Sequence, residues 1–154
     1  MRLAVLLVLW FALPAHAEMR AASTALTLAR NKGKPIRVLA KQVQVESVDW
    51  LTPCTVRLVV VPQHPQFQRF SIDVTYLVTA TGAIENGRAP IKAEILPAGS
   101  TESIATRRGE VSVTRRKPHD FDAKLTAAFD HGGVAWTLAA TVRLTGSDCL
   151  WDMH

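Results

Sequence analysis

The sequence predicts an all-β fold, an antiparallel immunoglobulin-like β-sandwich of about seven or eight strands. Two observations lead to this prediction. Apolar residues recur at every second position in several segments, as they do in strands that bury one face. Residues that favour turns separate these segments at short intervals. With 154 residues, 48% of them hydrophobic, the chain is long enough for one domain with a substantial core.

Residues 1–17 have the pattern of a cleaved signal peptide. Arg2 precedes an apolar run from Leu3 to Leu13, and Ala15-His16-Ala17 puts small residues at the two positions that a signal peptidase recognises. The run of about 11 residues is shorter than the ~20 needed to cross a bilayer, so we expect no stable membrane anchor. The expected product begins at Glu18 and is periplasmic or secreted.

Residues 18–34 predict a flexible linker. The apolar residues of this segment are mostly alanines, with Leu26 and Leu28, which is too little for a packed element. The sandwich domain is therefore expected to span residues 35–154.

Three segments show the clearest strand pattern. Residues 70–76 alternate apolar and polar side chains, which predicts a strand with one buried face. The same alternation covers residues 121–129 and resumes over residues 134–144, with a Gly-Gly pair between them that tolerates positive φ. The last two segments predict a hairpin whose buried set includes Trp136.

The remaining strands are less regular. Residues 36–48 shift their apolar phase between Ala40 and Val43, which predicts a bulge or a bend. Residues 54–61 contain a continuous apolar run, as expected of a strand near the centre of a sheet. Further strands are expected at residues 91–95 and, as short polar edge strands, at residues 101–107 and 110–116.

Cys54 and Cys149 are the only two cysteines. A cysteine pair in an exported chain predicts a disulfide, because the compartments that receive such chains are oxidising. In the chain-entropy model, a bridge that closes a loop of about 100 residues contributes up to roughly 4.7 kcal/mol. The alternative is two separate buried thiols.

The formal net charge is +5, and basic residues gather between positions 107 and 117. If the two edge strands pair with each other, these side chains share one end of the sandwich and form a binding patch for lipid phosphates, anionic glycans or an acidic protein surface. The alternative is that the charges protect an exposed sheet edge. The candidate patch consists of Arg107, Arg108, Arg115, Arg116 and Lys117.

The sequence predicts no cofactor. The chain has no HExxH motif and no CxxC pair, and His64 and His131 fit loop and turn positions. An alternative is a copper site formed by Met153 and His154, since thioether and imidazole ligands suit that metal.

We expect no enzymatic activity. The candidate nucleophilic serines lack a Gly-X-Ser-X-Gly context. Asp122 and Asp130 lie on the polar face of one strand, where exposed carboxylates are common. A hydrolase is the third hypothesis, and its candidate serines are Ser100, Ser103 and Ser112.

The interpretation is an exported binding module, an accessory, inhibitor or chaperone-like subunit of an envelope or secretion process. The expected partner is another envelope or secreted protein, or an anionic surface. Nucleic acid is not expected, because the chain is exported and no aromatic residues are interleaved with the arginines at positions 107–116. The alternative function is a periplasmic carrier of a metal or of a small anionic ligand. The sequence leaves the oligomeric state open.

Overall fold

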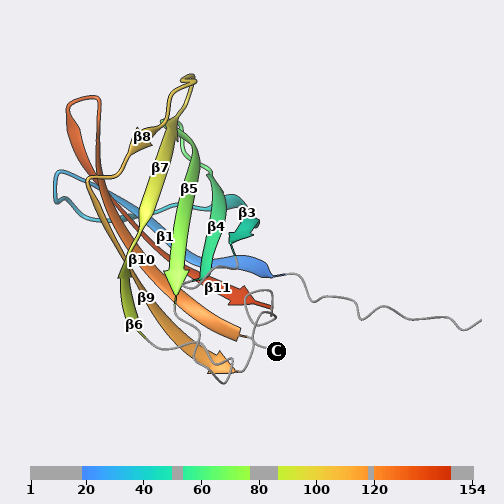
Figure 1. Ribbon diagram of the computed structural model, residues 1–154. Helices are drawn as coiled ribbons and strands as arrows, with labels where there is room; N and C mark the ends of the chain where they lie inside the picture. Colours follow the sequence, from blue (N-terminus) through green and yellow to red (C-terminus); the bar gives the residue numbers. More distant parts are fainter. Residues whose placement is uncertain (1–18, 50–53, 77–86, 118–119, 147–154) are drawn as a thin grey trace, which may run out of the picture.

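The computed structural model describes residues 19–49, 54–76, 87–117 and 120–146. In these ranges the chain forms 11 strands and no helix (Figure 1). In chain order the strands are β1 (Arg20–Arg30), β2 (Ile36–Arg37), β3 (Ala40–Asp49), β4 (Cys54–Pro62), β5 (Phe67–Tyr76), β6 (Gly87–Pro90), β7 (Lys92–Pro97), β8 (Ile104–Ala105), β9 (Arg108–Lys117), β10 (Asp120–His131) and β11 (Val134–Thr145).

These strands form two antiparallel sheets that pack against each other. The six-stranded sheet has the order β2-β1-β11-β10-β9-β6, and the five-stranded sheet has the order β3-β4-β5-β7-β8. Figure 1 shows the two layers, with β4, β5 and β7 in one and β1, β9, β10 and β11 in the other. The predicted all-β, sandwich-like architecture is confirmed. The expected number of seven or eight strands is too low, because the described residues form 11.

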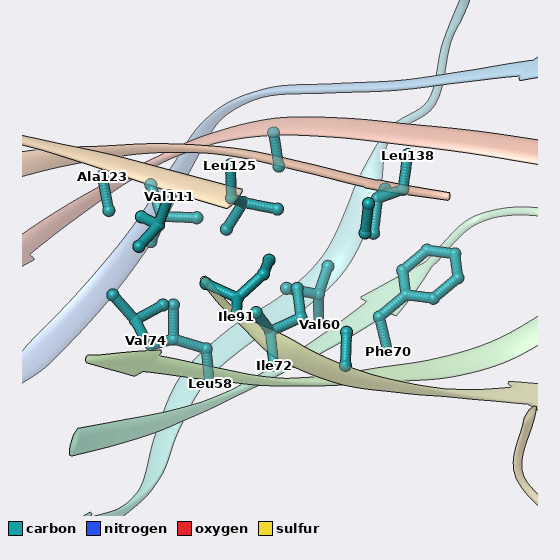
Figure 2. Packing of buried hydrophobic residues seen from close by; sticks show 14 of the residues in the cluster. Leu58, Val60, Phe70, Ile72, Val74, Ile91, Val111, Ala123, Leu125 and Leu138 are labelled. Carbon is teal, nitrogen blue, oxygen red and sulfur yellow. The ribbon is translucent and has the colours of Figure 1, made fainter. Parts of the chain in front are cut away.

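One hydrophobic core lies between the sheets. Figure 2 shows side chains of β4 and β5 directed toward those of β9, β10 and β11. Every second residue is buried from Phe121 to Phe129 and from Trp136 to Leu144, as a strand with one inward face requires. Residues of both layers are less than 2% exposed, among them Leu58, Phe70, Ile72, Val111, Leu125 and Leu138.

The hairpin of β10 and β11 is confirmed. The two strands pair over their whole length. Gly132 and Gly133 form the turn with φ values of 60° and 73°, which lie in the left-handed region that glycine adopts without strain. Trp136 is 4% exposed, so its predicted place in the core is also confirmed.

The predicted linker at residues 18–34 is wrong, because residues 20–30 form β1. This strand pairs with β11 from end to end, and its Leu26 and Leu28 are each 2% exposed. The small alanines in the rest of β1 suffice because β11 and the opposite sheet supply the larger core side chains. The folded domain therefore includes β1 instead of beginning near Pro35.

Several other strands agree with the sequence pattern. β4 lies between β3 and β5 in the interior of its sheet, as its apolar run predicts. A register shift between Ala40 and Gln42 confirms the bulge expected in β3. β5 and β7 cover the segments expected at residues 70–76 and 91–95 with slightly different ends.

The two strands expected at sheet edges do not pair with each other. β8 has two residues and is the edge of the five-stranded sheet, next to β7. β9 belongs to the other sheet, between β10 and β6. The edge prediction is correct for β8 and wrong for β9, because the chain changes sheets between them.

The chain also changes sheets at Ile91, between β6 and β7. The Ile91 side chain packs closely over β9, where a Cβ on Gly109 would lie 2.6 Å from Ile91 Cγ1. Gly109 O accepts a hydrogen bond of 3.1 Å from Ile91 N. A glycine is therefore required at position 109 by this close approach.

Candidate functional site

The five basic residues of the predicted patch do not come together at one end of the sandwich. They depend on a hairpin that does not form, because β9 pairs with β10 and β6 while β8 pairs with β7. Arg108 begins β9 and Lys117 ends it, and a strand of this length separates its ends by about 30 Å. A single patch of Arg107, Arg108, Arg115, Arg116 and Lys117 is thus contradicted by the strand order.

Carboxylates of β10 lie beside two of these arginines. Arg107 Nε is 2.7 Å from Asp130 Oδ2, and Arg116 Nη1 is 3.7 Å from Asp122 Oδ2. Asp122 Oδ1 also accepts a hydrogen bond of 3.3 Å from Arg143 Nε on β11. The positive charge near both ends of β9 is therefore partly neutralised by the neighbouring strand.

A different region contains most of the unbalanced positive charge. Residues 19–45, which we call the acid-free segment, contain six basic residues and no acidic one. The rest of the chain, with 12 basic and 13 acidic residues, has a formal charge of −1. All six side chains are exposed, and none of them forms an ion pair within the described residues. They are Arg20, Arg30, Lys32, Lys34, Arg37 and Lys41.

The turn in the middle of the acid-free segment is tied to the fold. Arg30 O accepts a hydrogen bond of 2.6 Å from Gly33 N, and Asn31 and Lys32 have φ values of 46° and 60°, the pattern of a type I′ turn. Asn31 N donates to Ala135 O at 2.8 Å, and Asn31 Oδ1 accepts from Ala135 N at 3.1 Å. Lys32 is thus held in a conformation that non-glycine residues rarely adopt.

Two large apolar side chains of the same segment are exposed. Ile36 is 67% exposed and Leu39 is 64% exposed, and no other large hydrophobic residue in the described ranges is as open. Ile36 pairs with Leu28 across β1 and β2, so it lies on the core-facing side of the sheet, at its margin. These two residues extend the core toward solvent.

A hollow of about 380 Å³ lies between β1 and β3. Alanines of β1 form one wall, and Val38, Leu39 and Val43 line the other. Arg37 and Lys41 are the charged residues among those that line it, and none of the lining residues is acidic. The hollow therefore has both polar and apolar lining atoms, and its formal charge is positive.

An aromatic cluster lies beside Arg30, at the end of β1. The ring centroid of Phe67 is 5.0 Å from that of Trp136 in a T-shaped contact and 5.1 Å from that of His64 in a stacked one. Arg30 Cζ lies 5.4 Å from the Trp136 ring centroid, a cation–π contact. His64 Nδ1 accepts a hydrogen bond of 3.2 Å from Gln66 N, and burial lowers the pKa of His64 below 6.5.

The outer face of the six-stranded sheet has two further hollows, of about 360 and 390 Å³. Threonine and alanine side chains of β10 and β11 form much of their lining. Charged residues of both signs surround them: Arg108 and Glu110 at the first, and Arg88, Glu110 and Lys124 at the second. Mixed charge gives this face no preference for an anion or a cation.

The candidate hydrolytic residues are not coupled. Asp122 and Asp130 are on one strand, about 26 Å apart along it, and each lies beside an arginine. Ser100 Oγ donates to Glu102 O at 3.0 Å and accepts from Glu102 N at 3.1 Å, so it stabilises its own turn. Ser103 directly precedes β8 of the five-stranded sheet, whereas Ser112 lies on β9 of the six-stranded sheet.

The candidate metal ligands are only partly covered by the structure. Both His64 and His131 contact Phe67, with ring centroids 5.1 and 5.6 Å apart. Within the described ranges, no group of three or more His, Cys, Asp or Glu side chains could hold a metal ion. Met153 and His154 lie outside the described residues.

The disulfide prediction also involves residues outside the described ranges, because Cys149 is one of them. Cys54 begins β4 and is 4% exposed. The described part of the chain contains no free cysteine. The pairing of Cys54 with Cys149 stays a prediction.

The acid-free segment was open to discovery from the sequence alone, since its signal is the absence of Asp and Glu over 27 residues. The prediction of a linker at residues 18–34 conflicts with such a surface, because the charges of a flexible linker have no fixed positions. The exposure of Ile36 and Leu39 has no such signal in the sequence, because it depends on long-range packing.

No protein-family model, curated protein or solved structure matches this chain. In the part of the chain that the structure describes, no helix is long and apolar enough to cross a membrane.

Proposed function

We propose that this protein is an exported, non-catalytic binding module that recognises an anionic polypeptide. In this role it is an accessory, inhibitor or chaperone-like subunit of an envelope or secretion process. The observation that carries the proposal is the acid-free segment, whose six exposed cations form no ion pair within the described residues.

Three features of this segment favour recognition over a solubilising role. Its charges have one sign, so they attract an anionic partner and repel a cationic one. Ile36 and Leu39 add exposed apolar area beside these charges, and binding surfaces combine such a centre with a polar rim. β1 and the turn after it are fixed by β11, which lowers the entropy lost on binding.

Export, the disulfide and a detailed immunoglobulin-like topology belong to the same proposal. The signal peptide, Met1 to Ala17, predicts that protein recovered from the periplasm has an intact mass beginning at Glu18. Non-reducing peptide mapping should join Cys54 to Cys149. Retention of residues 1–17 in a membrane fraction would contradict export.

The function is tested by affinity capture from envelope extract with the immobilised protein. Captured proteins are identified by mass spectrometry, purified and titrated against the wild type at two ionic strengths. We expect an acidic partner whose affinity falls with added salt, because charges beyond about 8 Å are screened at physiological ionic strength. A variant in which Lys32, Lys34, Arg37 and Lys41 are replaced by serine should lose the partner. The proposal would be refuted if the affinity for the partner changed neither with added salt nor with these substitutions.

A further inference from the structure

We infer that the hollow between β1 and β3 binds an extended acidic segment of the partner polypeptide. Its apolar contacts are Leu39, which lines the hollow, and Ile36, which precedes the lining residue Arg37 in the chain. This inference rests on the proposed function and assigns the site and the chemistry of its ligand.

The hollow has the size and shape for a few side chains of an extended chain. Its volume of about 380 Å³ is at the small end of the range of roughly 300–1,000 Å³ for ligand sites. It runs between strands of different sheets, and β2 with Val38 after it pairs with β1 at Leu26, Thr27 and Leu28. Side chains of an extended segment can therefore enter the hollow from solvent while the backbone of the segment stays outside it.

The β3 backbone offers part of the recognition. Within the described residues β3 has a partner strand on one side only, because it is the edge of the five-stranded sheet. Register shifts at Ala40–Gln42 and Val45–Ser47 leave a regular stretch of residues 42–45 between them. Edge strands can accept an added strand, and bulges limit how much of the edge can pair. Backbone pairing is thus confined to a short stretch, and side chains supply the rest.

The charges select an acidic ligand. Arg37 and Lys41 line the hollow, and no acidic residue does. Lys32 and Lys34 are exposed in the turn and connection that precede β2. A cationic segment would bind more weakly here, because it would be repelled by Arg37 and Lys41 and would also lack the attraction that an acidic segment has.

Two other occupants fit less well. A second copy of the chain would bring a formal net charge of +5 and another acid-free segment. An anionic bilayer could contact exposed cations and apolar side chains, but a flat lipid surface leaves a hollow between two strands unfilled. An extended polypeptide uses the hollow, the edge of β3 and the charges together.

The test uses a fluorescein-labelled peptide of about 12 residues in which valine or threonine alternates with glutamate, matching the strand period. Its counterpart has glutamine at every glutamate position. Fluorescence anisotropy gives the dissociation constant of each peptide for the purified protein. We expect the acidic peptide to bind about tenfold more tightly than its counterpart, and added salt to reduce the difference.

Two double variants locate the site. Arg37→Glu with Lys41→Glu should weaken acidic-peptide binding by about tenfold, and Ile36→Ser with Leu39→Ser should weaken it by about fivefold. Arg108→Glu with Lys117→Glu makes the same change in net charge on β9 and should leave affinity within about twofold. All six residues are exposed or half-exposed, and circular dichroism confirms that each variant is folded.

Each contrary result has a defined meaning. The assignment of this hollow would be overturned if the acidic peptide did not bind. It would also be overturned if the β9 control variant lost as much affinity for the acidic peptide as the Arg37/Lys41 variant. If the captured natural partner still bound in a salt-dependent way, the proposed function would stand although the assignment of the hollow had failed. Tight binding to vesicles of one part phosphatidylglycerol to two parts phosphatidylcholine, with no peptide binding, would show that the ligand is a lipid surface and refute the inference.

Discussion

Two basic regions of this molecule differ in what lies opposite their charges. Around β9, Arg107 and Arg116 lie beside carboxylates of β10 at 2.7 and 3.7 Å. In the acid-free segment six exposed cations have no ion-pair partner among the described residues. The dense cluster of arginines in the sequence is therefore the more neutralised region, and the sparse one is the more positive.

The difference shows that strand pairing decides whether the cations of a basic segment lie beside carboxylates. Antiparallel pairing places β9 beside β10, which contains Asp120, Asp122 and Asp130. β1 is placed beside β11, which has no acidic residue. Local charge density thus says less about a surface than the strands on either side of it.

The largest expected effect tests whether the acid-free segment is a structural strand. Leu28→Ala should lower the free energy of unfolding by about 2–5 kcal/mol, because it removes a fully buried side chain of β1. Ile36→Ala, which shortens the exposed residue paired with it, should change it by no more than about 0.5 kcal/mol. Urea denaturation measures both, and equal small effects would restore the linker interpretation.

The turn after β1 provides a second test, with a gain in stability. Lys32 has a φ of 60°, and a left-handed conformation costs a non-glycine residue roughly 1–2 kcal/mol. After the larger entropy loss of glycine, Lys32→Gly should stabilise the fold by about 0.5–1 kcal/mol. The affinity of the Lys32→Gly variant for the acidic peptide should fall, because one cation is lost. Lys34→Gly removes the same charge without relieving strain and should not raise the melting temperature.

A third test concerns the neutralised region. Arg107 and Asp130 are each about half exposed at the side chain, at 54% and 56%, so their coupling in a double-mutant cycle should be about 0.2–1 kcal/mol and should fall with salt. Arg37→Ala should show no comparable loss of stability, since Arg37 has no ion-pair partner within the described residues. A larger loss for Arg37→Ala would contradict the comparison.

The smallest expected effect is a pH dependence at the aromatic cluster, where Arg30 lies over Trp136. Burial lowers the pKa of His64 in the folded protein below its ordinary value of 6.5, so the unfolded chain binds this proton more readily. The free energy of unfolding should fall as pH decreases from 6.5 to the folded-state pKa of His64. Below that pKa the contribution of His64 should no longer change with pH.

His64→Gln should remove this part of the pH dependence, because glutamine does not titrate and its side-chain oxygen can accept the hydrogen bond from Gln66 N. Thermal melts between pH 5 and pH 8 measure the change, with His131→Gln as the control that retains the His64 contribution. An unchanged pH profile in His64→Gln would refute the assignment.

Much of the fold follows from the sequence, because its longest strands bury one face. The alternation in residues 121–129 and 134–144 is strong enough to predict the hairpin, its Gly-Gly turn and the burial of Trp136. The bulge in β3 also appears as a shift of apolar phase. These features depend on local patterns, which a sequence displays directly.

The errors come from long-range pairing. β1 has too few large apolar residues to predict a strand, since it depends on β11, more than 100 residues away. β8 and β9 are close in sequence but lie in different sheets. The predicted positive patch therefore lies in the wrong region, although the sequence itself contains no acidic residue at positions 19–45.

The most direct test of the central claim is hydrogen–deuterium exchange of the protein with and without its captured partner. Binding through the acid-free segment should slow exchange at the amides of β2 and β3, from residue 36 to residue 46, and leave those of β9 unchanged. Protection confined to residues 108–117, with no change at residues 36–46, would show that the β9 cations form the binding surface and would contradict this account.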